Sequence, residues 1–559
     1  MPARARTAVS GWAYGHAERL HPVALAFALT FFAASMTPSL LPRAWYLQAV
    51  ATGLSSVIGY GLGCFVVWVV RGCGLSPRFS ARTRRLGWRV LGWTSAVVVP
   101  LALVLGTYWQ RIVRELVGRT SAPYGTYLAV LPLALLIAAT ILLVARGIRA
   151  LSQRIILRLD RFLPAPVARL IGVMLVVVLV VLAADATVQR GLVATAERAA
   201  QVADRDTPPG VVRPTSPLRS GSPESPERWE TLGSEGRRFV AGGSDAEAIG
   251  AVTQRTALEP IRVYAGRDAA GPGGDERDVA ARVVAELDRT GAFERGTLAV
   301  ATTTGTGWVN ETIASAFEHV TSGDCAIAAM QYSYLPSPVA FVVDRETPRA
   351  AGQALLEAVQ ARLATIPEVQ RPRLVVFGES LGSYGSQAAF PDAEALVTGV
   401  DGALLVGTPG FAEPWGTITA NRDAGSLERL PVVDGGAAIR FAASPEDLQL
   451  DGAPWGDHRI VFWQHASDPI TWWSTDLLLQ RPDWLREPAG PDVDPGVRWF
   501  PVVTFWQVSL DMVFSLDVPD GHGHAYGLDA VDLWAAIVQP EGWDGQATAR
   551  VRAALAESR

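Results

Sequence analysis

Lysine is absent from the chain of 559 residues, so all 49 basic residues are arginine. This absence excludes a Schiff-base lysine and the lysine of a phosphate-binding Gly-Lys loop. Cysteine is scarce too, with only Cys64, Cys73 and Cys325 and no CxxC pair, which argues against a disulfide framework or a cysteine-based zinc site. We interpret Cys325 as a small core residue and expect no cofactor and no metal ion.

Charged residues are also few, at 18 % of the chain, whereas 49 % are hydrophobic and the mean hydropathy is +0.21. A purely cytosolic protein is therefore not expected. Acidic residues are nearly missing from residues 1–186, which hold 19 arginines and four acids, a net charge of +15; the remainder holds 30 arginines and 50 acids, a net charge of −20. The two parts are expected to lie in different environments.

Long apolar runs fill the first part of the chain. Each approaches the about 20 residues that a helix needs to cross the hydrocarbon core of a membrane. No Asp, Glu or His lies in the middle of a run, which disfavours ion transport. We predict a transmembrane domain of about five helices over residues 1–190, the first of them a retained anchor rather than a signal peptide. The runs are 22–41, 47–70, 91–109, 127–145 and 170–186.

The distribution of arginine predicts the orientation of these helices. The N-terminus and the segments after the second and fourth runs hold fifteen arginines, including Arg4, Arg6, Arg19 and Arg78, whereas the alternate segments hold four. Basic segments stay in the cytoplasm, so an odd number of crossings places the rest of the chain outside the cell membrane. Nucleic acid is not expected as a partner, because few aromatic residues interleave the arginines.

The composition changes again after residue 190. A segment rich in Pro, Ser and Gly within 191–257 predicts a tether. Residues 258–559 alternate apolar runs with helical stretches, which predicts a mainly parallel sheet covered on both faces, an α/β domain. The expected strands are 260–266, 297–303, 325–334, 373–380, 402–409 and 459–468, and the clearest helical stretches are 278–291 and 350–366.

The sequence Gly378-Glu379-Ser380-Leu381-Gly382 fits the pattern G-x-S-x-G. The apolar run 374–377 precedes it directly, and residues 385–389 can open a helix, which gives a strand, a turn and a helix. The two glycines are needed because such a turn crowds the backbone. We interpret Ser380 as a nucleophile; the alternative is a serine in an ordinary turn.

A serine hydroxyl needs a base to take its proton. Where this pattern marks the nucleophile, an acid and then a histidine follow it along the chain. Only His522 and His524 stand late enough, and we favour His524 because it belongs to a His-x-Tyr sequence. His522 stays an alternative base. Two ordinary loop histidines, or a metal pair completed by Asp468, are the other interpretations.

Asp468 is the expected acid, because it follows the run 459–463 at once in a Ser-Asp-Pro turn. Its role would be to orient the imidazole and stabilise the imidazolium. Asp457 and Asp476 are the fallback positions. Asp468 could instead cap the helix that follows it.

The loop 303–308, Thr-Thr-Gly-Thr-Gly-Trp, follows the expected strand 297–303. It stands where a backbone donor to the oxyanion of the reaction would come from, so Thr304, Gly305 and Thr306 are candidates, beside the N–H of Leu381 as the first donor. A glycine-rich loop also fits phosphate binding, but neither a lysine nor a dinucleotide fingerprint accompanies it.

Together these features resemble a family of bacterial integral-membrane proteins with a C-terminal α/β-hydrolase catalytic domain. The resemblance covers nearly the whole chain and implies an α/β-hydrolase fold in which Ser380, Asp468 and His524 form a catalytic triad. It leaves the substrate open. The motifs that carry it are 260–266, 304–308, 331–334, 378–382, 467–469 and 521–524.

We therefore expect a membrane-anchored serine hydrolase, esterase-like or lipase-like, that cleaves a lipid or another acyl ester at the outer membrane face through an acyl-enzyme. An acyltransferase with the same triad is the nearest alternative, because an alcohol can replace water as the acyl acceptor. A membrane protein with a binding or transport-associated role and a non-catalytic hydrolase fold is the alternative from another class.

Overall fold

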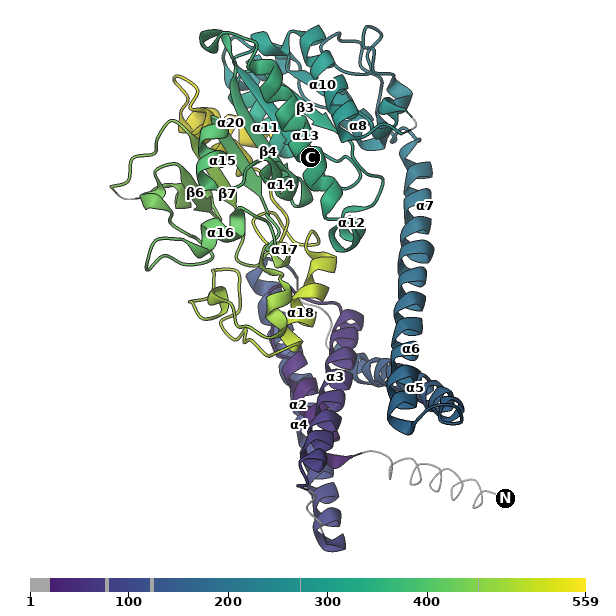
Figure 1. Ribbon diagram of the computed structural model, residues 1–559. Helices are drawn as coiled ribbons and strands as arrows, with labels where there is room; N and C mark the ends of the chain where they lie inside the picture. The colour runs from purple at the N-terminus through teal and green to yellow at the C-terminus, as the bar shows by residue number, and fades with distance from the viewer. Residues whose placement is uncertain (1–20, 76–79, 121–124, 272, 451) are drawn as a thin grey trace. The chain divides into compact units, whose positions relative to one another are not determined.

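The computed structural model describes residues 21–75, 80–120, 125–271, 273–450 and 452–559. Arg4, Arg6, Arg19 and Arg78, which enter the prediction of orientation, lie outside the described residues. The chain divides into two compact units, shown as ribbons in Figure 1. The first unit comprises Met1–Ala184 and Thr475–Phe514, and the second comprises Asp185–Ser474 and Ser515–Arg559.

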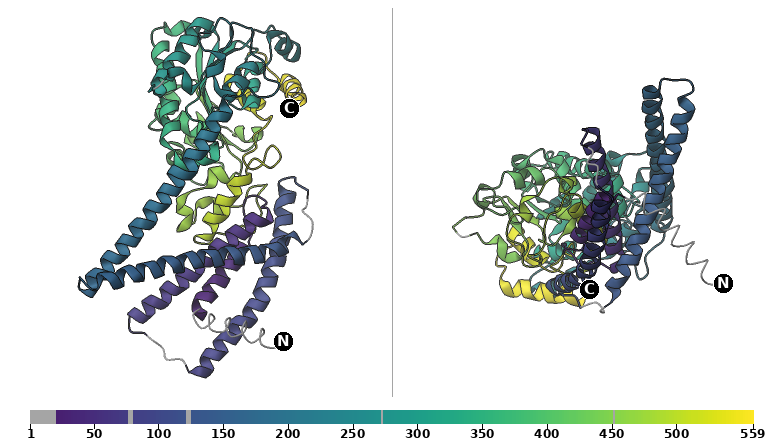
Figure 2. Two further views of the ribbon diagram at one scale, coloured as in Figure 1. Left: turned by 90° about the vertical axis from the view of Figure 1, so that its right-hand side faces the viewer. Right: turned by 90° about the horizontal axis from the view of Figure 1, so that it is seen from below.

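Long helices form most of the first unit (Figure 2). They are α2 (Pro22–Ser35), α3 (Trp45–Gly72), α4 (Ala81–Leu116), α5 (Val130–Leu159), α6 (Ala165–Asp185) and α18 (Val503–Asp511), with short 3-10 turns at Thr126–Ala129, Thr475–Leu478, Asp483–Leu485 and Met512–Phe514. The helix α2 packs along α3 and α4, and α3 packs along α5.

Among the described residues, three helices are long and apolar enough to cross a membrane: α3, α4 and α5 with the turn before it. The prediction of about five is therefore met only in part. The apolar stretch Leu170–Ala183 of α6 is shorter, and α2 has only 14 residues. In the first run the helix ends at Ser35 because Pro38 follows closely, and a proline disfavours helical backbone in the residue before it.

A buried ion pair joins α18 to the chain that follows α2. Arg43 Nε lies 2.9 Å from Asp511 Oδ1, and the two side chains are 1 % and 0 % exposed. Asp511 Oδ2 accepts hydrogen bonds from the N–H groups of Leu40 and Leu41, at 3.1 and 3.4 Å, and from the Ser39 hydroxyl. The backbone is no longer helical here, so Asp511 supplies acceptors that a helix would otherwise supply.

We expect Asp511→Ala to destabilise the first unit by about 3–5 kcal/mol, because the Arg43 guanidinium would stay buried without its counter-ion. Thermal unfolding of the purified chain in detergent measures the loss as a lower Tm. Glu115→Ala, which removes an exposed acid of α4, is the control and should change the unfolding free energy by less than about 0.5 kcal/mol. Equal Tm values for the two variants would contradict this role of the ion pair.

A seven-stranded sheet lies at the centre of the second unit. All of its strand pairs are parallel, in the order β1-β3-β2-β4-β5-β7-β6, which confirms the expected parallel sheet. Six strands match the expected ones; β6, a four-residue strand at the edge, was not anticipated. The strands are β1 (Ile261–Ala265), β2 (Thr297–Thr302), β3 (Cys325–Met330), β4 (Arg373–Glu379), β5 (Gly402–Val406), β6 (Ile439–Ala442) and β7 (Arg459–Trp463).

Helices surround this sheet, except α7, which continues from α6 and contacts α8 (Figure 1). The helices of the second unit follow in chain order. They are α7 (Ala194–Asp204), α8 (Gly233–Ala241), α9 (Ala246–Thr253), α10 (Glu276–Thr290), α11 (Glu311–Val320), α12 (Ser337–Val343), α13 (Glu346–Leu363), α14 (Leu381–Ser386), α15 (Ala393–Gly399), α16 (Trp415–Ala420), α17 (Pro469–Trp472), α19 (Ala530–Val538) and α20 (Gly545–Glu557). The sequence sets their ends locally: α10 begins at a capping box between Asp275 and Asp278 and ends at Gly291, whose φ is 70°.

The stretch expected to be a tether is partly helical. Helices α7, α8 and α9 lie within residues 191–257, and Phe239, Val240 and Ile249 on the last two are buried. The intervening residues 205–228 run as turns and extended chain. This part of the chain therefore contributes apolar side chains to the second unit.

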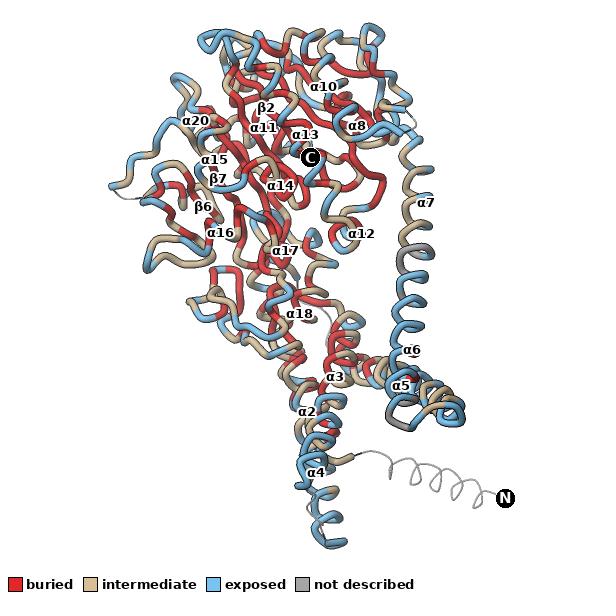
Figure 3. Tube along the Cα trace, in the orientation of Figure 1, coloured by how far each residue is buried: buried red, intermediate tan, exposed pale blue. Residues whose placement is uncertain are grey.

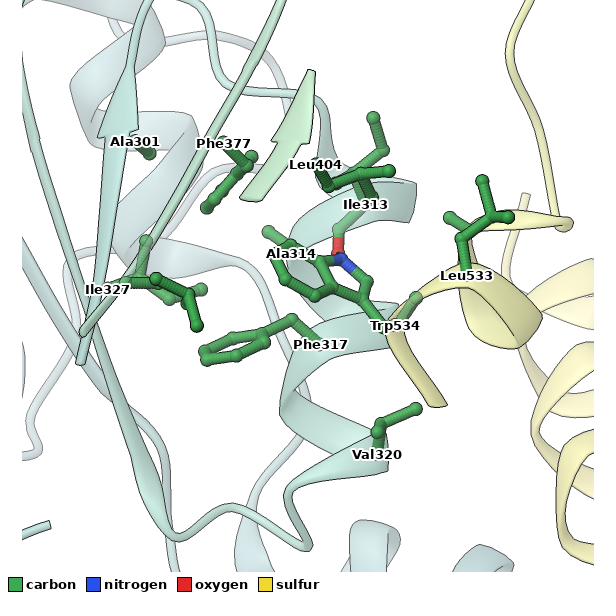
Figure 4. Packing of buried hydrophobic residues seen from close by; sticks show 14 of the residues in the cluster. Ala301, Ile313, Ala314, Phe317, Val320, Ile327, Phe377, Leu404, Leu533 and Trp534 are labelled. Carbon is green, nitrogen blue, oxygen red and sulfur yellow. The ribbon is translucent and has the colours of Figure 1, made fainter. Parts of the chain in front are cut away.

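The core of the second unit is packed around Trp534 of α19 (Figure 4). Its ring centroid lies 4.9 Å from that of Phe317 and 5.8 Å from that of Phe377, and its Nε1 donates to the Ile313 carbonyl at 3.1 Å. Figure 3 shows that buried residues concentrate along the sheet. Because Phe377 belongs to β4, this packing fixes the strand that leads to Ser380.

Candidate active site

Ser380 stands in a sharp turn between β4 and α14. Its φ of 57° and ψ of −121° are strained for a residue other than glycine. A Cβ on Gly378 would collide with the backbone of Gly382, and one on Gly382 would collide with the Thr302 carbonyl. The pattern G-x-S-x-G is therefore explained by backbone crowding, and the predicted strand, turn and helix are present.

Two backbone hydrogen bonds hold this turn. The N–H of Ser380 donates to the Val406 carbonyl of β5 at 2.9 Å, and the N–H of Tyr384 donates to the Ser380 carbonyl at 3.0 Å. Ser380 thus stands at the carboxyl ends of two adjacent parallel strands, the edge where α/β sheets bind ligands.

Asp468 follows β7 and is fully buried. Its Oδ1 accepts from the Ile470 N–H at 2.8 Å, which caps α17. Its Oδ2 lies 2.7 Å from His524 Nδ1 and accepts from the Tyr526 hydroxyl at 2.9 Å. Asp468 is therefore both a helix cap and the partner of a histidine. Its Oδ1 caps α17, and its Oδ2 contacts His524.

The imidazole of His524 is 4 % exposed and lies against β5. A Cβ on Gly407, the residue after β5, would collide with His524 Cε1. Because Ser380 bonds to Val406, the neighbour of Gly407, the imidazole and the serine belong to the same edge of the sheet. Burial alone would lower the pKa of His524, but Asp468 and Glu379 outweigh it and the pKa is raised.

A second layer of contacts holds the turn that carries His524. The His465 ring stacks on Tyr526 with centroids 4.2 Å apart, and its Nδ1 lies 2.9 Å from the Gly523 carbonyl. The Gly523 N–H donates to the Ser467 hydroxyl at 2.8 Å. The residues on either side of Asp468 and of His524 are thus bonded to each other.

The end of β2 lies against the serine turn, because a Cβ on Gly382 would collide with the Thr302 carbonyl oxygen. The N–H of Thr304 donates to the Trp308 carbonyl at 3.1 Å and so closes the loop itself. Gly305 and Thr306, together with Leu381 at the start of α14, stay predicted donors to an oxyanion.

Residues that could bind a metal ion do not gather here. Within the described ranges, His, Cys, Asp and Glu side chains form no group of three suited to a metal. The oxygens of Asp468 instead accept hydrogen bonds from the Ile470 N–H and the Tyr526 hydroxyl and contact His524 Nδ1.

Comparison with known families gives two matches. Residues 261–551 match the Alpha/beta-hydrolase family, and residues 36–244 match the Alpha/beta-hydrolase family N-terminus. The chain belongs to the alpha/beta-hydrolase family. Searches of curated proteins and of solved structures found no match. The parallel sheet with helices around it fits the fold of this family.

The structure of this alpha/beta-hydrolase also gives the places of the other candidates. His522 is half-buried, and its carbonyl accepts from the Ala525 N–H at 3.0 Å. Asp457 precedes β7 and therefore lies at the opposite edge of the sheet, and Asp476 belongs to the first unit.

Sequence reasoning missed three residues of this alpha/beta-hydrolase site. Tyr526 bonds to Asp468, and its only signal was the His-x-Tyr sequence. Glu379 is 6 % exposed and accepts from Asn310 Nδ2 at 2.6 Å. Glu379 occupies a variable position of G-x-S-x-G, and Asn310 carried no signal, because their contact is set by the fold alone.

We expect Gly407→Ala to slow Ser380-dependent turnover of a chromogenic ester by about 100-fold, because the added Cβ would displace the imidazole. The control is Gly435→Ala, at a similar φ of 63° but with nothing within 4 Å of the added atom. Steady-state rates are compared after thermal unfolding has shown that the two variants have equal Tm values. A slower rate of Gly407→Ala alone then reports displacement of the imidazole rather than backbone strain. Equal rates would show that the imidazole does not act where it now lies.

Proposed function

We propose that this alpha/beta-hydrolase is a serine hydrolase, esterase-like or lipase-like, that cleaves acyl esters through an acyl-enzyme on Ser380. The proposal is carried by the buried contact of 2.7 Å between His524 Nδ1 and Asp468 Oδ2 at the edge of the sheet that holds Ser380. A carboxylate on Nδ1 keeps the proton there, so Nε2 presents its lone pair. Nε2 is buried with no hydrogen-bond partner among the described residues.

In the proposed first step, His524 Nε2 takes the proton of the Ser380 hydroxyl while Oγ attacks the ester carbonyl carbon. The N–H of Leu381 and the loop around Gly305 and Thr306 would hold the oxyanion. The carbon–oxygen bond to the alcohol then breaks, and His524 returns its proton to the leaving alcohol. Water attacks the acyl-Ser380 ester in the same way, which releases the carboxylic acid and restores the hydroxyl.

We also infer that the helices of the first unit anchor the chain in the cell membrane, with the segments after α3 and after α5 in the cytoplasm and the catalytic unit outside, beside lipid or other acyl-ester substrates. A cytoplasmic N-terminus requires that the apolar run 22–41, of which α2 forms 14 residues, crosses the membrane as well. The basic segments after α3 and after α5 favour the cytoplasmic side. The side of the catalytic unit then depends on α6. Its 21 residues give about 31 Å of helix, which is enough for one more crossing.

Labelling with a fluorophosphonate probe tests the nucleophile. We expect the wild-type chain to be labelled and Ser380→Ala to lose the label completely, because the probe bonds to an activated hydroxyl. Ser386→Ala is the matched control: Ser386 is the last residue of α14, the short helix that follows Ser380, and its hydroxyl donates to the Phe377 carbonyl at 3.3 Å. Undiminished labelling of Ser380→Ala would contradict the proposal.

Reporter fusions test the orientation. Alkaline phosphatase fused after Arg559 should be active, because it folds only outside the cytoplasm, whereas a fluorescent protein fused after Leu163, beyond α5, should be bright. An inactive phosphatase at the C-terminus, in cells where the second fusion is bright, would show that α6 does not cross and that the catalytic unit is cytoplasmic.

A further inference from the structure

We propose that Glu379 is a positioning residue of this site: a second carboxyl group that acts on Ser380 through the His524 imidazole. The inference rests on the proposed serine-hydrolase function and deepens it. Glu379 is the last residue of β4 and directly precedes Ser380. The pattern G-x-S-x-G places no demand on this position, so the role comes from the surroundings of the side chain.

The Glu379 carboxyl is buried at the end of β4, and the neighbouring strand β5 ends beside the imidazole. The residue is 6 % exposed and lines a small pocket with Trp308 and Asn310. In the sheet it pairs with Val406, the residue before the glycine that His524 Cε1 touches. Glu379 and His524 therefore both lie beside the end of β5, Glu379 opposite Val406 and the imidazole beside Gly407.

Asn310 holds the carboxyl with a donor of fixed direction. Its Oδ1 accepts from the Ile313 N–H at 3.2 Å and so caps α11. This leaves Nδ2, a donor only, to meet Glu379 Oε2 at 2.6 Å. A donor that cannot be turned into an acceptor favours the ionised carboxylate over the neutral acid.

The charges that face Glu379 oppose one another. Burial raises the pKa of Glu379 to about 7, although His524 and the Asn310 bond act to lower it, and Asp468 raises it further. His524 and Asp468 are the titratable groups whose charges act on the carboxyl, whereas the uncharged Thr302 of β2 and Asn310, the N-cap of α11, line its pocket. Glu379 can therefore gain or lose a proton near neutral pH.

The protonation of Glu379 changes what the imidazole experiences. When His524 takes the serine proton it becomes an imidazolium, which faces two carboxylates if Glu379 is ionised and Asp468 alone if it is not. Ionised Glu379 should thus stabilise the charge that develops during acylation. The proton that Glu379 loses on ionisation passes to the solvent buffer.

The rate of fluorophosphonate labelling of the full-length chain in detergent, followed between about pH 5 and pH 9, tests this role. For Glu379→Gln we expect a plateau about tenfold slower and an acidic limb lower by about one pH unit, because His524 loses a charge that raises its pKa. Glu379→Asp restores the charge and should recover most of the plateau.

Asn310→Ser provides a matched variant that acts in the opposite direction. A serine at this position can still cap α11, but it lacks the amide donor to Glu379. Glu379 should then ionise at higher pH, so the part of the labelling rate that depends on it should move to higher pH. A general loss of structure would not move two profiles in opposite directions.

A second measurement does not need activity. A carboxyl whose folded pKa of about 7 exceeds its usual 4.5 stabilises the folded chain at low pH, and this stability is lost as the pH rises through about 7. The Tm of the wild type relative to Glu379→Gln should therefore fall between these two pH values. Glu368→Gln, at an exposed acid, should show no such trend.

The outcomes separate the two proposals. If the wild type is not labelled, the serine-hydrolase function fails, and a Tm difference independent of pH would also reject the titration of Glu379. If labelling occurs but its pH profile is the same in Glu379→Gln, the action through His524 is wrong. Opposite shifts in Glu379→Gln and Asn310→Ser, together with the falling Tm difference, would support the inference.

Discussion

The close approach of three backbone segments at the carboxyl edge of the sheet is the constraint on which the site depends. Gly378, Gly382 and Gly407 each stand where a Cβ would collide with a neighbour, and those neighbours are the serine turn, the end of β2 and the imidazole. A strained turn such as that of Ser380 costs about 1–3 kcal/mol and persists only where the surroundings determine it. Here the bonds to Val406 and from Tyr384 do so.

Asp468 connects this edge to the rest of the second unit because its two oxygens have separate partners. One oxygen caps α17 and thereby fixes the carboxylate to the backbone, and the other receives His524 and Tyr526. A histidine that is buried and bonded on Nδ1 has one tautomer and one orientation. Burial also raises the pKa of Glu379 to about 7. The same exclusion of water therefore affects the protonation of both His524 and Glu379.

The sequence predicted those parts of the fold that local pattern determines. Apolar runs of strand length gave six of the seven strands, and the glycine spacing located the serine turn, because both follow from neighbouring residues. The edge strand β6 has four residues, too few for a distinct pattern. The contact of Asn310 with Glu379 joins residues 69 positions apart, and no pattern in one sequence reports such a contact.

The first unit shows the same limit. Apolar length identified α3, α4 and α5, but Pro38 ends α2 early, and the backbone beyond it needs acceptors from elsewhere. They come from Asp511, which is 471 residues away from Leu40 along the chain. Buried backbone N–H groups outside a helix need acceptors from other parts of the chain. Asp511, which belongs to none of the predicted apolar runs, thus accepts the backbone hydrogen bonds at the end of the first run, 22–41.

This arrangement also explains why the residues around Asp468 and His524 are bonded so densely. The segment Thr475–Phe514, which belongs to the first unit, leaves the second unit shortly after Asp468 and returns shortly before His524. Closing a flexible loop of this size costs about 4 kcal/mol or more in chain entropy. The bonds Ser467–Gly523, His465–Gly523 and Asp468–His524 close it at its base. The contacts that orient the imidazole therefore also hold together the two ends of the chain from which the segment Thr475–Phe514 of the first unit is inserted.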